Sequence, residues 1–364
     1  MIRKILKRLL NEITNPSFGL TRKTIYYFHA LLSKANILKH HKNNKKGVLI
    51  WDIRSNPITF DIIYLVYIGY RFFHNKNIKE FDVIIFIPKD YIFKSYTWEE
   101  YSRYLSGRDL KKRINNMLIP ILIHFNCIKK VRILDNKKKL LNVCNRIVTF
   151  PEFYNPFYYY KSGFDSYKTL YKLLKRNIYP NPYISSPRSR YKILSEVSKN
   201  SEIKSYITFT LRDYGFAPKR NSSTSQIKLI YDFSKNINKK LILIPDQISK
   251  LSNYEIPSDV LIHNGARKSI DKRIALYQFS ELNFFVQAGP SDLSHFIKDS
   301  KTIILNWGSP SFDGSIKYME KEYGLYLNDQ PYKHLNSYLI WYKNSGIITN
   351  KDIMMAYLQF KNNV

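Results

Sequence analysis

In the second half of the chain, short apolar runs alternate with segments in which apolar residues recur at helical spacing. This pattern predicts strands that alternate with helices. Strands are predicted at residues 205–213, 240–246, 283–290 and 302–307. Helices are predicted between them at residues 222–238 and 271–282, and another begins at Ser291. Strands and helices of these lengths in alternation are typical of a parallel sheet that helices cover on both faces.

The same alternation begins earlier in the chain, so the sequence predicts an α/β fold with two Rossmann-like domains in tandem and a cleft between them. Further strands are predicted at residues 45–52, 81–88, 130–134 and 146–150, with helices from Thr59 and over residues 109–125. The segment 151–187 is dense in Tyr, Pro and Asn, as in an irregular junction. The predicted divisions are an N-terminal domain over 45–187, a C-terminal domain over 188–331, and a helical tail over 332–364 that packs across the junction.

The charge of the chain indicates an anionic partner. Its 364 residues include 59 Lys and Arg against 28 Asp and Glu, which gives a net charge of +31. Such an excess is typical of proteins that meet nucleic acid, an anionic membrane or phosphorylated substrates. The alternative is a compositional bias, because the chain is rich in Asn, Ile, Tyr and Phe as well as in Lys.

Residues 1–44 form a separate basic segment, in which apolar residues recur at helical spacing as far as Pro16 while Lys and Arg occupy the other face. Such a helix lies on an anionic membrane surface or packs on the body of its own protein. No apolar run reaches the ~18–20 residues of a membrane span, and no signal peptide is visible. The sequence therefore predicts a cytoplasmic protein, and peripheral binding to the inner face of the cytoplasmic membrane is one of the two roles left open for this segment.

The common metal-binding motifs are missing from the sequence. Cys127 and Cys144 are the only cysteines and lack metal-ligand spacing, and no H-x-x-x-H, C-x-x-C or D-x-D motif occurs. The two cysteines also indicate no disulfide framework, which fits a reducing cytosol. The sequence thus favours chemistry that needs neither a metal nor a cofactor.

Ligands of parallel sheets bind beyond the carboxyl ends of the strands, and polar residues follow each predicted strand end. In the C-terminal domain these candidate binding residues are Arg212, Asp213, Asp246, Gln247, Gly289, Pro290 and Ser291. Glycine lets a backbone approach a ligand closely, Ser291 can cap the following helix, and amides at a helix start attract phosphate. An ordinary strand-to-helix turn is the alternative for residues 289–291.

Two arginines are candidates for binding phosphate. Arg212 follows a strand, where a guanidinium can hold phosphate with two hydrogen bonds; a surface arginine in a basic protein is the alternative. Arg273 lies in the first turn of a predicted helix, where a cation opposes the helix dipole, which suggests an anionic partner. Asp246 can accept hydrogen bonds from sugar hydroxyls or cap the next turn.

The matching strand end in the N-terminal domain carries Asp52, Arg54 and Ser55. A carboxylate that faces a phosphate-binding domain can act as a general base, and Asp52 is the candidate. Its competing role is a turn acid that is hydrogen-bonded to residues 55–57. The aromatic run 154–160 is interpreted either as a stacking surface for bases or sugar rings, or as the core of the junction.

These features resemble the GT-B glycosyltransferases of bacterial surface-polysaccharide and lipopolysaccharide assembly. The resemblance is carried by the tandem strand-helix domains, by Leu211-Arg212 at a strand end, and by the strand 283–290 that opens into a helix. It implies a nucleotide-sugar donor on the C-terminal domain, a glycan or lipid-linked acceptor on the N-terminal domain, and no metal. It also implies that Arg212, Arg273 and the amides of 289–291 neutralise the departing diphosphate, with Asp52 as base. An E-x7-E pattern is missing, which favours an inverting displacement.

Other functions fit the same pattern. Nucleotide-sugar epimerases and pyruvyl transferases share the two-domain shape, and a fold does not fix a function. A basic nucleic-acid-binding protein would use the charge and the aromatic residues, but the lysines are spread along the chain, so nucleic acid is the less favoured partner. A third alternative is a non-catalytic protein of the membrane surface, which would keep the fold but not the activity.

Overall fold

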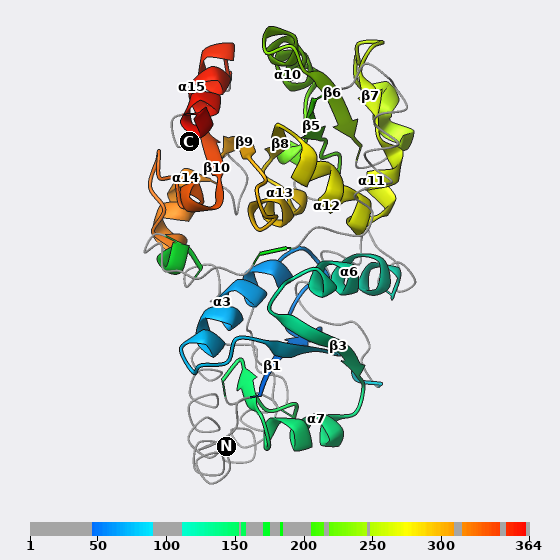
Figure 1. Ribbon diagram of the computed structural model, residues 1–364, viewed down its shortest axis with the longest axis vertical. Helices are drawn as coiled ribbons and strands as arrows, with labels where there is room; N and C mark the ends of the chain where they lie inside the picture. The colour runs from blue at the N-terminus through cyan, green and yellow to red at the C-terminus, as the bar shows by residue number, and fades with distance from the viewer. Residues whose placement is uncertain are drawn as a thin grey trace, which may run out of the picture.

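Two parallel β-sheets, one in each half of the chain, form the framework of the protein (Figure 1). The computed structural model describes residues 46–89, 111–152, 154–157, 170–174, 183–184, 205–214, 218–245, 248–308, 315–342 and 347–361. The predicted α/β fold with two Rossmann-like units is confirmed. The basic segment 1–44 lies outside the described residues.

The N-terminal sheet has four strands in the order β3-β2-β1-β4, and all of its pairs are parallel. The strands are β1 (Gly47–Asp52), β2 (Phe81–Phe86), β3 (Ile128–Leu134) and β4 (Val148–Phe150). Every residue of β1 is buried, because an inner strand of a parallel sheet is covered on both faces, and this is why the strand is visible in the sequence as an apolar run. β3 lies at the edge and exposes Lys129 and Lys130.

Helices pack on both halves of the molecule. The N-terminal half contains α3 (Ile62–His74), the π-helical turn η1 (Ile114–Leu118), α6 (Ile119–Ile123) and α7 (Lys137–Cys144). Nearly all of α3 is buried, because it packs on β1 on one side and on the C-terminal half on the other. Among the described residues, no helix is long and apolar enough to cross a membrane.

The C-terminal sheet has six strands in the order β10-β9-β8-β5-β6-β7, again all parallel. Its strands are β5 (Tyr206–Thr210), β6 (Lys240–Ile244), β7 (Leu261–Ile262), β8 (Leu282–Val286), β9 (Thr302–Trp307) and β10 (Ser337–Trp341). The helices and helical turns here are η2 (Pro218–Arg220), α10 (Thr224–Asn236), η3 (Ile248–Asn253), α11 (Asn264–Lys268), α12 (Ile270–Phe279), α13 (Gly289–His295), α14 (Ile316–Tyr318), η4 (Met319–Tyr323), η5 (Lys333–Leu335) and α15 (Asn350–Lys361).

The tail differs from the sequence prediction. The tail 332–364 was expected to be helical, but β10 lies within it as the edge strand of the C-terminal sheet, paired with β9. Asn336, in the left-handed region at φ 53°, ends the helical turn before the strand. The final helix α15 packs on β10 and α10 of its own domain. β10 is a short apolar run that is buried as a strand, although the elements before and after it in the chain are helical.

A bulge in β9 directs one large side chain toward the domain junction. Asn306 adopts φ 54°, and the pairing with β10 changes register between Leu339 and Trp341. The extra residue places Trp307 in the same hydrophobic cluster as Ile304, where strict alternation would put it on the opposite face. The ring of Trp307 therefore meets Tyr332 edge-on, with 6.1 Å between centroids.

Of the three hydrophobic clusters among the described residues, one spans both halves, whereas each half also has a cluster of its own. The cluster that contains β1 and α3 continues through Leu170 and Ile184 into α12, α13 and β9. Tyr67 and Phe125 of the N-terminal half both contact the ring of Phe296, at centroid distances of 5.4 and 6.4 Å. The junction is therefore a packed interface to which aromatic rings of both halves contribute.

Gly289 lies close to Phe60 of the N-terminal half. A Cβ added to Gly289 would lie 2.5 Å from Cδ2 and 3.0 Å from Cβ of Phe60. Rotation of the ring cannot relieve a contact with the Cβ atom, so α3 and α13 would have to separate. We expect Gly289→Ala to lower the free energy of unfolding by about 1–3 kcal/mol, measured by urea denaturation.

A double-mutant cycle tests this contact. Phe60→Ala should remove most of the cost of Gly289→Ala, because the two changes act on one contact. Gly265→Ala is the matched control, since an added Cβ there would meet only side-chain atoms of His263 and Lys272, at 3.2 Å or more. If Gly289→Ala is as stable as the unchanged protein, Gly289 and Phe60 are not in the close contact described here.

Candidate active site

The carboxyl ends of the two sheets face each other. The chain leaves β1 and enters α3, and it leaves β8 and enters α13, and these two helices contact one another (Figure 1). In the C-terminal sheet the strand order reverses direction between β5 and β8, and in the N-terminal sheet between β1 and β4. Open parallel sheets bind their ligands at such switch points, so the candidate site lies where these ends meet.

Arg212 follows β5 and is held in place by the loop that leads to α10. Its guanidinium donates a hydrogen bond to the side chain of Asn221, and its backbone amide donates to Ser222 Oγ at 3.0 Å. Asn221 also accepts a hydrogen bond from the amide of Tyr214, at 3.1 Å. Arg212 and the adjacent Asp213 are both buried, so the loop fixes them at the carboxyl end of the central strand.

Arg220 spans the switch point. Its Nε and one terminal nitrogen donate to the carbonyl oxygen of Gln287, at 3.2 and 2.9 Å. Gln287 follows β8, whereas Arg220 belongs to the loop after β5, so the guanidinium bridges the ends of the two strands. Arg220 is only partly buried and places a fixed positive charge at this point.

Arg273 is bound to a backbone carbonyl group in the structure. α12 begins at Ile270 with Ser269 as its cap, and Arg273 is its fourth residue. The partner of its Nε is the carbonyl oxygen of Ala266 in α11, at 3.0 Å, rather than an anion. None of the described contacts joins Arg273 to Arg212, so the structure gives these two arginines different neighbours.

The turn after β8 differs in detail from the prediction. α13 starts at Gly289, with Ala288 at the cap position and Pro290 in the first turn, so the prediction that Ser291 starts and caps the helix is wrong. The hydroxyl of Ser291 donates to the Ala288 carbonyl oxygen at 2.5 Å. Proline suits this place because its missing N–H would be unsatisfied there. The candidates Asp246 and Gln247 lie outside the described residues.

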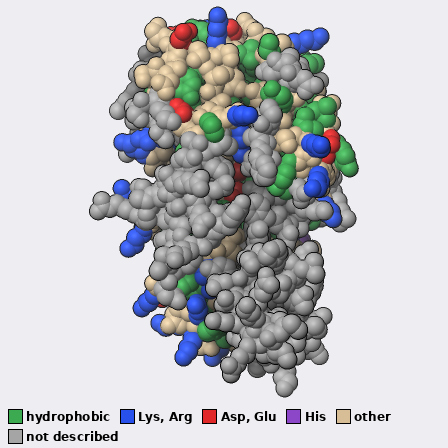
Figure 2. All heavy atoms as spheres, turned by 180° about the vertical axis from the view of Figure 1, so that it is seen from behind, with side chains coloured by type: hydrophobic (Ala, Val, Ile, Leu, Met, Phe, Trp, Pro, Cys, Tyr) green, Lys and Arg blue, Asp and Glu red, His purple; other side chains and the backbone are tan. Residues whose placement is uncertain are grey.

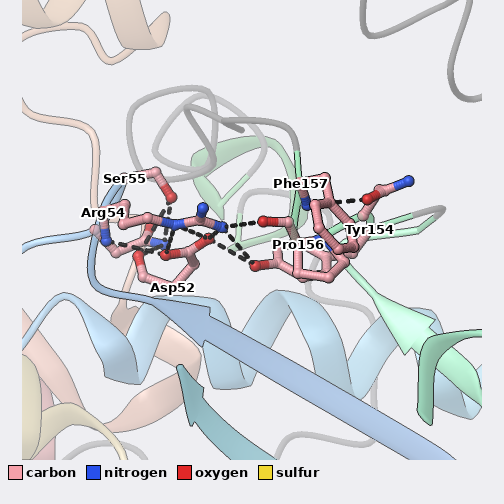
Figure 3. A network of polar contacts seen from close by, with 8 residues as sticks. Asp52, Arg54, Ser55, Tyr154, Pro156 and Phe157 are labelled. Carbon is pink, nitrogen blue, oxygen red and sulfur yellow. Dashed lines mark hydrogen bonds and ion pairs between the residues drawn. The ribbon is translucent and has the colours of Figure 1, made fainter. Parts of the chain in front are cut away.

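Asp52, Arg54 and Ser55 come together at the end of β1, in a buried polar cluster (Figure 3). Arg54 pairs with Asp52 at 2.6 Å, and the exposed fractions of the two side chains are 5% and 3%. The amide of Arg54 donates to Asp52 Oδ1 at 3.0 Å, and a terminal nitrogen donates to the Pro156 carbonyl oxygen at 2.8 Å. Ser55 donates to the Asp52 carbonyl oxygen at 3.3 Å.

Tyr154 completes this cluster from a distant segment of the chain. Its hydroxyl donates to Asp52 Oδ2 at 2.6 Å, across a separation of 102 residues. Burial raises the pKa of Tyr154 well above its usual value, and the negative charge of Asp52 raises it further. Burial alone would lower the pKa of Arg54, but hydrogen bonds and the charge of Asp52 outweigh it and raise the pKa. The cluster is therefore a neutral tyrosine beside a charged pair.

This geometry favours one of the two roles left open for Asp52. Both carboxylate oxygens accept hydrogen bonds from Arg54, and Oδ2 accepts one from Tyr154 as well. The Asp52 carbonyl oxygen accepts the amide of Asn56 at 2.9 Å, as expected of a residue that holds a turn. The catalytic role of Asp52 stays a prediction, and the pairing supports the turn role.

A second carboxyl group lies at the contact between α3 and α13. Asp292, in the first turn of α13, accepts a hydrogen bond from the hydroxyl of Tyr64 in α3. Burial raises the pKa of Asp292 well above its usual range; the hydrogen bond from Tyr64 lowers it, the charge of Asp61 raises it, and that of Arg220 lowers it. A carboxyl group with a strongly perturbed pKa between two domains is typical of a functional site.

Several solved structures are similar to this chain. No protein family and no curated protein matches the sequence. The glycosyl transferase family 9 structure from Veillonella parvula is 11% identical over 88% of this chain and 97% of its own, with a TM-score of 0.47. E. coli heptosyltransferase WaaC with ADP-2-deoxy-2-fluoro heptose is 10% identical over 88% and 100%, with a TM-score of 0.42. E. coli ADP-heptose lps heptosyltransferase II is 11% identical over 88% and 100%, with a TM-score of 0.44.

These matches are glycosyltransferases. Among the described residues of the present chain, no group of three or more His, Cys, Asp or Glu side chains gathers as metal ligands would.

Sequence reasoning missed Asp292 and the bridging role of Arg220. Tyr64 and Asp292 are separated by 228 positions, and Arg220 and Gln287 by 67, so no local spacing joins them. Asp292 directly follows the turn 289–291 that the sequence singled out, but an acid in the first turn of a helix is ordinary. Only the packing of α3 on α13 distinguishes it.

Proposed function

We propose that the protein is a glycosyltransferase that moves a sugar from a nucleotide-sugar donor to a surface-glycan or lipid-linked acceptor, by an inverting and metal-independent displacement. The observation that carries this proposal is the placement of Arg212 and Arg220 at the switch point of the C-terminal sheet. Guanidinium groups suit a diphosphate because they offer paired donors and a permanent charge. The acceptor class comes from the resemblance of the sequence to enzymes of surface-polysaccharide assembly.

The roles of the other candidates follow from their positions. Asp213 and the turn of Gly289, Pro290 and Ser291 flank the same switch point and would line the donor site. Arg273 would support it through α11, to which its guanidinium is bound. Asp52, Arg54 and Ser55 would shape the acceptor side by fixing the turn after β1. The basic segment 1–44 would hold the enzyme on an anionic membrane.

Binding of nucleotides tests the donor site. We expect one of UDP, GDP, ADP or CMP to raise the melting temperature without Mg²⁺, because a ligand of the folded state adds ~2.7 kcal/mol of stability at a hundredfold excess over its Kd. Arg220→Ala should abolish that shift. Lys219→Ala is the matched control, because Lys219 is the exposed neighbour of Arg220 and should keep the shift.

The outcomes separate the alternative functions. A shift that survives in Arg220→Ala would contradict the placement of the donor. Nucleotide binding without transfer to any acceptor would favour an epimerase or a pyruvyl transferase. No shift with nucleotides and a strong shift with single-stranded RNA would favour a nucleic-acid-binding protein. Figure 2 shows the described Lys and Arg side chains scattered over one face, rather than gathered in one stripe as such a protein would need.

A further inference from the structure

Asp292 is held from the opposite domain. The hydroxyl of Tyr64 in α3 donates to its Oδ1, and the same hydroxyl lies 3.3 Å from the hydroxyl of Tyr332. Tyr332 is fully buried and its hydroxyl donates to that of Tyr171 at 3.4 Å. The tyrosines therefore fix one oxygen of Asp292 in a defined direction at the contact between the domains.

The second oxygen of Asp292 is open. Among the described residues Oδ2 accepts no hydrogen bond, and it is not one of the buried polar atoms that lack a partner, so it reaches the molecular surface. Asp52 differs, because its two oxygens are occupied inside a buried ion pair. Of these two carboxyl groups, only Asp292 has an oxygen free to receive a proton from a substrate.

The charges around Asp292 suit proton transfer. Asp61 of α3 faces it from the N-terminal domain, and Arg220 faces it from the loop after β5. Tyr64, Tyr171 and Tyr332 are neutral hydroxyl groups, and burial raises the pKa of both Tyr171 and Tyr332. On its own helix, His295 is buried and uncharged, because burial lowers its pKa to about 3. The nearest cation among these groups is Arg220, which also lies at the proposed diphosphate site.

We propose that Asp292 is the general base of the transfer, and that Tyr64 is the residue that positions it. This inference rests on the proposed glycosyl transfer. The acceptor hydroxyl gives its proton to Oδ2 of Asp292 while its oxygen forms a bond to the anomeric carbon of the donor sugar. The bond from that carbon to the diphosphate oxygen breaks, and its electron pair leaves on the nucleotide, whose charge Arg220 offsets.

The raised pKa of Asp292 agrees with this role. A general base works best when its pKa lies near the working pH, and a raised pKa makes a carboxylate a stronger base. The hydrogen bond from Tyr64 favours the ionised carboxylate and lowers the pKa. Removal of that bond should raise the pKa, so that the base is protonated, and activity is lost, at a higher pH than in the unchanged protein.

The test measures nucleotide release by the full chain from UDP-glucose, GDP-mannose, ADP-glucose and a CMP-sugar, with octyl glucoside as acceptor. Asp292→Asn should lower kcat by about 100-fold or more and leave the nucleotide-dependent thermal shift unchanged. Tyr64→Phe should keep activity at high pH and move the acidic limb of the kcat profile to higher pH. A merely structural role of Tyr64 would not move that limb.

The control is Asp299→Asn, which makes the same chemical change at an exposed turn after α13. Asp299 has φ 65°, a conformation that asparagine also tolerates, so activity should not change. Asp292→Asn with a rate within about threefold of the unchanged protein would overturn the inference, as would an unmoved acidic limb in Tyr64→Phe. If the unchanged protein binds a nucleotide but releases none from any donor, the proposed function fails and the inference fails with it.

Discussion

Replacement of Arg54 by methionine should destabilise the protein by about 3–5 kcal/mol, because it leaves the buried carboxylate of Asp52 without a cation. The pair is nearly inaccessible to solvent, with exposed fractions of 5% and 3%. Arg54 also supplies the donor to the Pro156 carbonyl oxygen, which would lose its partner. Urea denaturation at neutral pH gives the free energy of unfolding directly.

The control removes both charges at once. The double variant Asp52→Asn/Arg54→Met should lose much less free energy of unfolding than Arg54→Met alone. The reason is that no ion is then left in the buried site. The introduced asparagine would keep an oxygen that can accept the hydroxyl of Tyr154, which now binds Asp52 at 2.6 Å. If the double variant is as unstable as the single one, the cost arises from lost packing against Phe86, over whose ring the Arg54 guanidinium lies at 5.0 Å.

Replacement of Tyr332 by alanine should lower the free energy of unfolding by about 3–5 kcal/mol, because it leaves a cavity at the centre of the junction. Tyr332 has no exposed surface and stacks on His295, with 4.0 Å between ring centroids and an interplanar angle of 8°. Trp307 and Tyr171 meet its ring edge-on at 6.1 Å. The loss would appear as a lower urea midpoint with an unchanged slope.

Tyr332→Phe separates the ring from the hydroxyl. This variant keeps the packing and loses only the hydrogen bonds to Tyr64 and Tyr171, which are long at 3.3 and 3.4 Å. We expect it to cost about 1 kcal/mol. Similar costs for the phenylalanine and alanine variants would show that the hydroxyl network, rather than the packed ring, stabilises the junction.

The order of strands and helices could be predicted because it depends on local burial. β1, β5 and β8 are buried on both faces and therefore appear in the sequence as continuous apolar runs. β7 has only two residues, and no periodicity reveals a strand so short. The sequence predicted a helix in place of β10, because β10 lies between helical segments and is too short to show its own period.

The structure shows which strand ends carry the candidate residues, and the role of these residues in binding stays a prediction. The rule that ligands bind at strand ends located Arg212 and the turn at Gly289 without knowledge of the strand order. The partners of charged groups depend on contacts between distant segments, as for Asp52 with Tyr154 and Asp292 with Tyr64. A single sequence carries no sign of such pairs, so it could not distinguish a paired carboxylate from an open one.

The hydrophobic cluster that spans both halves implies that each half is less stable alone than in the whole protein, although each also has a cluster of its own. If the chain were divided between the sheets, Tyr67 and Phe125 on one fragment and Phe296 on the other would lose their covering and face water. Exposed aromatic clusters of this kind favour self-association. The two sheets should therefore melt in one cooperative transition, and a nascent chain would stay vulnerable to aggregation until α13 has been synthesised and packs on α3.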